Sequence, residues 1–268
     1  MTQNQIFDLL TSLAADIREK KPQRPALIGV GGAQGSGKSF QCRCFVRESG
    51  LKVAHFSLDD VYLTLAEREA MARAVHPLFI TRGPPGTHDI EMARSLIATL
   101  MIAQPEQETK LPCFDKVKDD RAPESEWPVF VGRPDVILVD GWLIPAAPPV
   151  GMPTEAINGM EEIEDPHRIW RNHMLTPLAT RYPIFFRQFD ATIYLQAPSF
   201  DVVRDWRAEQ EKETLGRQLS GLEFAMLDRF VMHYERVTRA MLGGAQRADW
   251  VVRLDDARNV LGIEGRSA

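Results

Sequence analysis

An eight-residue stretch near the N-terminus constrains the fold of this chain more than any other. Residues 32–39 read G-A-Q-G-S-G-K-S, which satisfies the pattern G-x-x-x-x-G-K-[ST] in full. An apolar run precedes the stretch and a segment with helical character follows it. A glycine-rich turn between a strand and a helix can wrap its amide N–H groups around a phosphate, and the helix adds its positive end. The stretch therefore predicts a nucleotide-binding α/β protein.

The same motif assigns chemistry to individual side chains. We expect the Lys38 ammonium to bridge the β- and γ-phosphates of ATP and the Ser39 hydroxyl to hold Mg²⁺. A glycine-rich turn that binds no nucleotide is the alternative, and the strand and helix on either side argue against it. The expected nucleotide-binding residues are Gly32, Ala33, Gln34, Gly35, Ser36, Gly37, Lys38, Ser39 and Phe40.

Apolar runs alternate along the chain with helical or turn-rich segments. This alternation predicts a P-loop kinase fold in which helices flank a central, mostly parallel five-stranded sheet. With 268 residues, the chain suits a single domain that spans residues 1–268. An acidic stretch, residues 155–165, is expected to form a solvated surface excursion. The expected strands are residues 26–31, 52–58, 135–140, 191–196 and 250–254.

Composition and charge narrow the classes of partner. The formal net charge is −5, and acidic and basic residues are interspersed without a Lys/Arg block. No nucleic acid partner is expected, because a phosphate backbone needs a basic stripe. No membrane partner is expected either, because the apolar runs are too short for a span and the N-terminal segment lacks the pattern of a signal peptide. We expect a cytoplasmic protein, which its odd number of cysteines, three, also fits.

A second motif predicts a carboxylate beside the phosphate-binding turn. Residues 136–140 read V-I-L-V-D, an apolar strand that ends in Asp140. In a parallel sheet this places the carboxylate at the same edge as residues 32–39, where it could hold Mg²⁺ through water. The alternative is an ordinary aspartate that caps a turn at the end of a strand.

A third stretch, residues 57–64, supplies two more carboxylates at that edge. It reads S-L-D-D-V-Y-L-T and follows the expected second strand. An acceptor hydroxyl must lie in line with the γ-phosphate, and a nearby aspartate can orient it and accept its proton. Asp59 and Asp60 could serve in this way, or one of them could cap the next helix. The chain also lacks an N-K-x-D stretch, so a GTPase is not expected.

Six motifs in order resemble those of the D-glycerate kinase family of plant, fungal and bacterial type, within the phosphoribulokinase, uridine kinase and pantothenate kinase superfamily. The resemblance runs from about residue 29 to residue 239. The chain departs from the family where Lys116 is followed by V-K-D-D-R rather than by serine, and where Asp140 stands in place of glutamate. The six motifs are SLDDVYLT (57–64), RGPPGTHD (82–89), LPCFDK (111–116), DGW (140–142), WRAEQE (206–211) and HYERVTR (233–239).

The resemblance implies a role for individual residues on the acceptor side. It makes Asp59 the general base or hydroxyl-orienting group, and Asp60 a water-mediated Mg²⁺ ligand beside Ser39 and Asp140. Arg82 is the preferred carboxylate anchor, because its fork binds a carboxylate at two points. His88 could instead make only a structural hydrogen bond, and Lys116 and Arg121 could be solvated surface charges. The expected acceptor-binding residues, within an excursion over residues 80–130, are Asp59, Tyr62, Arg82, His88, Asp89, Lys116 and Arg121.

A lid is expected over residues 198–220. Arg204 and Arg207 lie on one helical face there and would stabilise charge in the transition state, unless Glu209 and Glu211 pair with them instead. Lys38, Asp59, Arg204 and Arg207 are therefore the expected catalytic residues. The resemblance implies transfer of phosphate from ATP to a hydroxyl of D-glycerate, with pantothenate, a nucleoside or another sugar acid as alternative acceptors. An ATP-binding regulatory protein without transferase activity is the alternative from another class, and the oligomeric state is not indicated.

Overall fold

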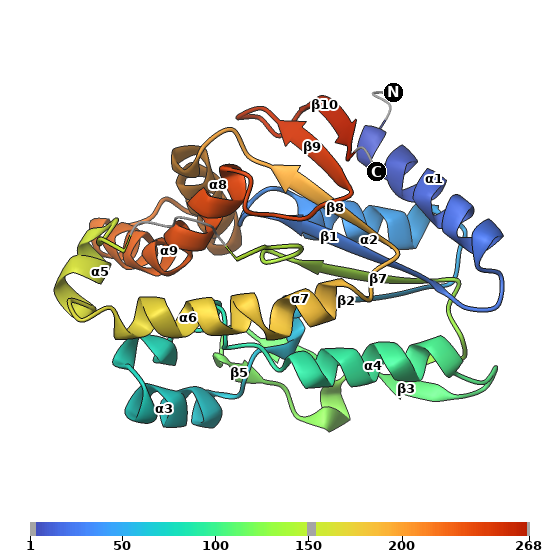
Figure 1. Cartoon of the computed structure of the whole chain (residues 1–268), viewed down its shortest axis with the longest axis horizontal. Helices are drawn as coiled ribbons and strands as arrows, with labels where there is room; N and C mark the ends of the chain where they lie inside the picture. The colour runs from blue at the N-terminus through green and yellow to red at the C-terminus, as the bar shows by residue number, and fades with distance from the viewer. Residues whose placement is uncertain (1–3, 149–153, 267–268) are drawn as a thin grey trace.

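The computed structural model describes residues 4–148 and 154–266 and centres on a six-stranded sheet (Figure 1). The strand order is β10-β9-β8-β1-β7-β2, and all neighbours pair in parallel except β10 and β9, which are antiparallel. The predicted α/β fold with a mostly parallel sheet is confirmed. The strands of this sheet are β1 (Ala26–Gly32), β2 (Val53–Ser57), β7 (Val136–Gly141), β8 (Ala191–Gln196), β9 (Trp250–Leu254) and β10 (Val260–Gly265).

The five expected strands are present, but the predicted number of strands is wrong. The sixth, β10, pairs with β9 along the edge of the sheet. Its sequence, V-L-G-I-E-G, carries two glycines and a half-buried pattern, so it lacks the apolar run that marks the other strands. By contrast β1 and β7 are buried along their whole length, because helices cover both faces of a parallel sheet.

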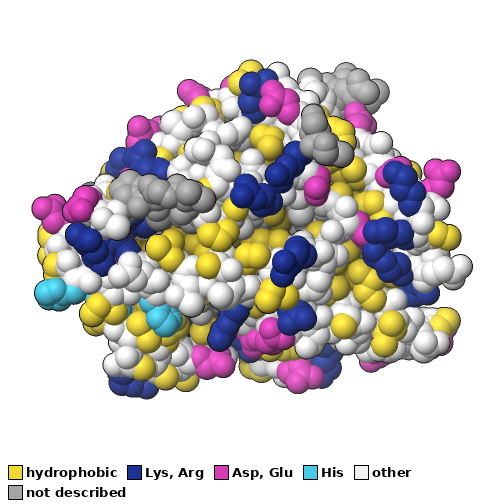
Figure 2. All heavy atoms as spheres, in the orientation of Figure 1, with side chains coloured by type: hydrophobic (Ala, Val, Ile, Leu, Met, Phe, Trp, Pro, Cys, Tyr) yellow, Lys and Arg dark blue, Asp and Glu magenta, His cyan; other side chains and the backbone are white. Residues whose placement is uncertain are grey.

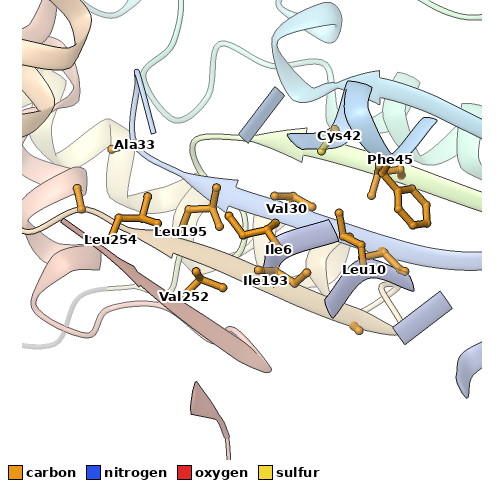
Figure 3. Close-up of a cluster of buried hydrophobic side chains, with 14 of the residues drawn as sticks. Ile6, Leu10, Val30, Ala33, Cys42, Phe45, Ile193, Leu195, Val252 and Leu254 are labelled. Carbon is orange, nitrogen blue, oxygen red and sulfur yellow. The ribbon is translucent and has the colours of Figure 1, made fainter. Parts of the chain in front are cut away.

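Helices α1 (Gln5–Lys20), α2 (Lys38–Glu48) and α8 (Phe200–Leu215) bury one face of the sheet. In the core between them, Ile6 and Leu10 of α1 and Phe45 of α2 pack with Val30 and Ile193 of the strands (Figure 3). Asn4 caps the start of α1 by accepting a hydrogen bond from the Phe7 amide. This core fixes the helix that follows the glycine-rich turn against the strand that precedes it.

The opposite face of the sheet packs against α4 (Ile90–Ile102), α7 (Arg181–Phe186) and the C-terminal half of α9 (Gly221–Leu242). Successive side chains of a strand point to opposite faces, so Ile137 and Val139 belong to this core while Leu138 belongs to the other. Helix α9 begins at a capping box between Ser220 and Glu223. The helix thus runs from the end of the expected lid, residues 198–220, into this core.

The remaining elements form the edge of the molecule that carries the acceptor-side motifs, and α3 and α4 lie together below the sheet in the view of Figure 1. Two small antiparallel sheets, β3-β6 and β4-β5, follow α4. Two further helices, α5 and α6, precede α7 and pack toward α9. These elements are η1 (Leu58–Val61), α3 (Leu65–Ala74), η2 (Pro77–Ile80), β3 (Glu108–Lys110), β4 (Phe114–Asp115), β5 (Asp120–Arg121), η3 (Glu124–Glu126), β6 (Val129–Val131), α5 (Gly159–Glu164) and α6 (Ile169–Ala179).

The acidic stretch 155–165 is solvated only in part: Glu155, Glu162 and Glu164 are exposed as predicted, but two other acids of the stretch are buried. Glu161 is fully buried, and its carboxylate accepts a hydrogen bond from the Arg236 Nε atom of α9 at 2.7 Å. Asp165 is equally buried and accepts from the Arg171 Nε atom of α6 at 2.9 Å. A buried carboxylate needs a paired cation, and the arginines that supply it lie in other helices. The burial of these two acids could not be predicted, because the composition of a segment does not reveal which arginines elsewhere in the chain pair with it.

The described residues contain no helix that is both long and apolar enough to cross a membrane. On the face drawn in Figure 2, Lys and Arg side chains are scattered among acidic and apolar ones.

Two buried histidines make the stability of the fold depend on pH. Burial lowers the pKa of His88 and of His233 from the ordinary 6.5 to about 4. Between pH 6.5 and 4 the unfolded chain therefore binds protons that the folded chain does not, so stability falls as the pH falls. At pH 5 we expect each imidazole to have cost about 2 kcal/mol of unfolding free energy.

Urea unfolding at pH 7.5 and pH 5 measures this loss. The His233→Gln variant should lose about 2 kcal/mol less than the wild type between the two pH values. His167→Gln, at an exposed position, is the matched control and should follow the wild type. An equal loss in wild type and His233→Gln would show that His233 ionises normally in the fold.

Candidate active site

The glycine-rich turn between β1 and α2 forms an open cradle. Gly35 and Gly37 have φ values of +76° and +86°, which side chains disfavour, and Gly37 is the residue from which α2 begins. A Cβ atom at Gly35 would lie 2.5 Å from the Trp206 Cβ atom of α8, so this helix closes one side of the cradle. A Cβ atom at Gly37 would meet nothing described within 4 Å, so that side stays open. The predicted phosphate-binding residues 32–39 thus form a turn that packs against α8 at Gly35 and is open at Gly37.

Lys38 is the first residue of α2, and its side chain turns back over the cradle. The Nζ atom lies 3.4 Å from the Ala33 carbonyl oxygen on the opposite side of the loop. Burial lowers the pKa of Lys38, and the carboxylates of Asp59 and Asp140 oppose that shift. Lys38 is thus held where phosphate oxygens would enter the loop, between two carboxylates that would flank the transfer.

Ser39 and Asp140 meet directly behind the cradle. The Ser39 hydroxyl donates to one oxygen of Asp140, which lies on β7 and is fully buried. Burial alone would raise the pKa of Asp140, but His55, Lys38 and Ser39 outweigh it, so the pKa is lowered and the carboxylate stays ionised. Its other oxygen, Oδ1, is buried without a hydrogen-bond partner among the described residues. An unsatisfied carboxylate oxygen next to a hydroxyl is a donor set that suits Mg²⁺.

His55 on β2 is a neighbour of this pair that sequence reasoning missed. Its Nε2 atom lies 3.4 Å from Asp140 Oδ1, and the Cys42 sulfur completes a group whose polar atoms all lie within 4.8 Å of one another. The position of His55 two residues before the end of a strand that runs to the sheet edge was the signal available, since the adjacent strand ends in Asp140.

Asp59 lies at the same edge, on the short helix η1. Its carboxylate accepts hydrogen bonds from the Tyr62 hydroxyl at 2.9 Å and from the Lys116 Nζ atom at 3.0 Å. Burial alone would raise the pKa of Asp59, but Lys116 and Lys38 outweigh it and hold the pKa well below the ordinary range. Asp59 is therefore an ionised carboxylate that faces the cradle, with two residues from the acceptor-side motifs bound to it.

Asp60 has a different place. Its carboxylate accepts from the Ser57 amide at 2.8 Å and completes a capping box at the start of η1. Burial raises the pKa of Asp60 to about 6. Of the two adjacent aspartates, Asp60 thus takes the capping role that the sequence left open. Its expected role as a water-mediated Mg²⁺ ligand stays a prediction.

Arg82 is already engaged within the chain. Its Nη1 atom donates to the carboxylate of Asp119, which also accepts from Arg68 at 3.0 Å. The guanidinium lies 5.5 Å from the centroid of the Phe114 ring and 5.9 Å from that of Phe230 on α9. The Asp119 pairing was not foreseen, because the two residues are 37 positions apart. A guanidinium has five N–H donors, so this pairing still leaves donors for a ligand.

The other expected acceptor-side residues mainly contact Tyr62, the neighbour of Asp59, and one another. The His88 Nδ1 atom lies 2.7 Å from the Tyr182 hydroxyl, and its ring stacks near Tyr62. Asp89 caps α4 and lies 3.8 Å from Arg121. Arg121 donates to the Tyr62 carbonyl oxygen at 2.7 Å. His88 makes the structural hydrogen bond that was its alternative role, and contact of any of these residues with an acceptor stays a prediction.

Helix α8, within the expected lid, carries Arg204 and Arg207, and both side chains form ion pairs. Arg204 pairs with Asp228 of α9, and Arg207 pairs with Glu211 one turn along its own helix at 2.7 Å. The Arg207 guanidinium also lies 5.9 Å from the Phe230 ring centroid. Of the two glutamates considered as partners, Glu211 does pair with Arg207. The Phe230 ring thus contacts both Arg82 from the acceptor side and Arg207 from the lid.

Comparison with known proteins places this geometry among known kinases. The chain is 29% identical over 230 residues to an uncharacterised kinase of Schizosaccharomyces pombe, mug58, and the match covers 81% of each chain. It is 27% identical over 229 residues to the chloroplastic D-glycerate 3-kinase of Arabidopsis thaliana, which covers 81% of this chain and 48% of the plant protein. No family model matches the chain.

Solved structures give the same result for the fold. The D-glycerate 3-kinase of Cryptococcus neoformans superposes with a TM-score of 0.77 at 20% identity, over 98% of this chain and all of that one. The homologues of this chain therefore include D-glycerate 3-kinase and related P-loop kinases, and the resemblance predicted from its six motifs is confirmed.

Proposed function

We propose that the protein is an ATP-dependent kinase that transfers the γ-phosphoryl group to a hydroxyl of D-glycerate, with ADP and a phosphoglycerate as products. One observation carries the proposal: Ser57 on β2 pairs in register with Asp140 on β7, so Asp59 lies at the same sheet edge as Ser39 and Lys38. An acceptor beside Asp59 would therefore face the phosphate cradle. The plant and fungal relatives named D-glycerate 3-kinase support the choice of acceptor.

ATP would bind in the cradle with Mg²⁺ as its counterion. Gly32 to Ser39 would supply inward N–H groups, and Lys38 would contact the β- and γ-phosphates. Ser39 and Asp140 would hold the metal, directly or through water, with the Asp140 Oδ1 atom, which makes no hydrogen bond with the described residues and lies 3.4 Å from His55 Nε2, as a ligand. The bound ion would neutralise part of the charge on the transferred group.

Within this site Asp59 would orient the acceptor. Its pKa is held low by Lys116 and Lys38, so it stays ionised and accepts a hydrogen bond from the acceptor hydroxyl. Phosphoryl transfer passes through a loose transition state that needs alignment more than a strong base. Lys38 would stabilise the charge that develops on the transferred phosphoryl oxygens. Arg204 and Arg207 would add positive charge when the lid, residues 198–220, closes over ATP.

The acceptor carboxylate would be recognised by Arg82 together with Lys116, in the excursion of residues 80–130. Lys116 lies 3.0 Å from Asp59, and its side chain is 60% exposed, so it can move onto a ligand. Arg82 keeps donors beyond those bound to Asp119. D-glycerate offers little apolar surface, so charge pairing must supply much of its affinity. Pantothenate, nucleosides and other sugar acids are the alternative acceptors of the same chemistry.

An acceptor panel in an ADP-release assay tests the proposal. With MgATP saturating, we expect kcat/KM for D-glycerate to exceed that for glycerol by about a hundredfold or more, because glycerol lacks the carboxylate and leaves the cations unpaired. Pantothenate and uridine should be no better than glycerol. A preference for either of them would reassign the acceptor and keep the kinase chemistry.

The rival from another class is a nucleotide-binding regulatory protein without transferase activity. Lys38, Ser39, Asp59 and Asp140 together favour transfer, because a protein that only binds nucleotide has no need of an ionised carboxylate on the acceptor side. Nucleotide binding without turnover on any acceptor would favour the rival. We further propose that the kinase acts in the cytoplasm, because its odd number of cysteines, three, fits a reducing compartment; the plant relative is chloroplastic.

A further inference from the structure

The turn between β9 and β10 presents an arginine in an unusual backbone conformation. Arg258 has a φ value of +67°, which residues with side chains other than asparagine and aspartate seldom adopt. Two hydrogen bonds to Asp255 hold the turn. The Asn259 amide donates to the Asp255 carboxylate at 2.7 Å, and the Arg258 amide donates to the Asp255 carbonyl oxygen at 3.0 Å. Strain of this kind persists where the surrounding structure fixes it, and it often marks a functional position.

The strained backbone aims the Arg258 side chain at the phosphate cradle. Its Nε atom donates to the Gly35 carbonyl oxygen at 2.6 Å, across 223 positions of sequence. The same guanidinium pairs with Glu209 of α8 at 2.8 Å and lies 4.9 Å from the Trp206 ring centroid. Trp206 in turn donates from its ring to the Asp256 carbonyl oxygen at 2.7 Å. One side chain thus joins the hairpin, helix α8 and the cradle.

The bond to Gly35 fixes the direction of an amide that faces the cradle. In a trans peptide the carbonyl and the following N–H point to opposite sides, so holding the Gly35 oxygen outward turns the Ser36 N–H inward. The Ser36 amide does point across the loop, toward the Ala33 carbonyl oxygen at 3.2 Å. The bond from Arg258 thus restrains from outside the loop a peptide plane that the Ser36 bond to Ala33 holds from within it.

We propose that Arg258 is a positioning residue for nucleotide binding, which acts through Gly35 by holding the cradle in its phosphate-binding shape. This inference rests on the proposed ATP-binding function, and it adds a residue from the C-terminal hairpin that none of the sequence motifs includes. Arg258 itself does not need to touch the nucleotide. The bond to Gly35 comes from the Nε atom and the pairing with Glu209 from the Nη2 atom, so the two contacts can be removed separately.

Nucleotide affinity of Arg258 variants, measured by calorimetry with MgADP and with a non-hydrolysable ATP analogue, tests the proposal without any acceptor. Arg258→Gln should weaken binding about tenfold, the usual effect of losing one charged hydrogen bond. The affinity of Arg258→Lys should lie between that of this variant and that of the wild type. An ammonium can donate to the Gly35 carbonyl oxygen, but it cannot also pair with Glu209 from a second nitrogen. KM for the acceptor should change by less than about twofold.

Arg258→Gly separates positioning from mere stability. Glycine adopts a positive φ freely, which offsets part of the stability lost with the contacts of the guanidinium, so this variant should melt above Arg258→Gln and yet bind nucleotide about tenfold more weakly than the wild type. A residue that only stabilised the hairpin would give the opposite pattern. Wild-type nucleotide affinity in Arg258→Gly and Arg258→Gln would overturn the proposal, and so would an affinity loss that merely follows a lower melting temperature.

Two matched controls complete the experiment. Arg253→Gln removes an arginine of the same hairpin that pairs with Glu264 at 2.7 Å, and it should leave nucleotide affinity unchanged. Glu209→Gln removes the ion pair but keeps the bond to Gly35, so its affinity should stay within about twofold of wild type. A loss in Glu209→Gln as large as that in Arg258→Gln would contradict action through Gly35. If no variant of the set and no wild-type protein binds nucleotide, the proposed function fails instead.

Discussion

Replacing Lys38 with alanine is expected to lower kcat by about 10²–10³-fold at saturating ATP while leaving the fold intact. The ammonium lies over the cradle, 3.4 Å from the Ala33 carbonyl oxygen, where it would meet the transferred phosphoryl group. Charge on that group grows in the transition state, so the lost interaction lowers kcat rather than only ATP affinity. Burial already lowers the pKa of Lys38 in the absence of nucleotide, so its removal should not destabilise the protein.

Steady-state kinetics with thermal melting as a control measure this effect. Lys38→Met keeps the aliphatic stem without the charge, so it should match Lys38→Ala in kcat if the charge is what matters. Lys110→Ala removes a lysine of β3 that pairs with Glu124, and it should leave kcat unchanged. Near-normal turnover in Lys38→Ala at saturating ATP would mean that residues 32–39 do not bind the phosphates as assigned.

The phosphate cradle could be predicted from sequence because its geometry is encoded locally. Glycines at positions 35 and 37 are needed where φ is positive, and Lys38 and Ser39 follow as the first residues of the next helix. The carboxylate of Asp140 could be placed beside them because parallel strands end at one edge of the sheet. The motif could not predict which residues from distant elements contact this site. Trp206 and Arg258 contact Gly35, and His55 lies beside Asp140.

The acceptor side was less predictable for the same reason. Arg82, Lys116 and Asp59 were identified from motifs, but their partners in the structure depend on tertiary contacts. Arg82 binds Asp119, which has a positive φ in the loop that departs from the family pattern. The strand β10 and the burial of Glu161 and Asp165 were missed because glycines weaken a strand signal and because burial of a charge depends on distant arginines.

Replacing Asp59 with asparagine is expected to lower kcat by about 10²–10⁴-fold with little change in the affinity for ATP. The amide keeps the shape of the side chain but carries no charge and is a weaker acceptor for the hydroxyl of the substrate. The Asp59 carboxylate accepts hydrogen bonds from Tyr62 and Lys116, and among the described residues it has none with residues 32–39. The loss should therefore appear in kcat and in acceptor KM, as the Lys116 ammonium loses its partner.

Asp60→Asn is the matched control, because the neighbouring carboxylate caps η1 through the Ser57 amide. If capping is its main role, this variant should lose about 1 kcal/mol of stability and keep kcat within a few-fold of wild type. A raised Mg²⁺ requirement in Asp60→Asn would support its further role as a water-mediated metal ligand. A large loss of kcat in Asp60→Asn, together with near-normal turnover in Asp59→Asn, would mean that the two roles are exchanged. That outcome would also move the acceptor hydroxyl away from Tyr62 and Lys116, and with it the carboxylate site proposed between Lys116 and Arg82.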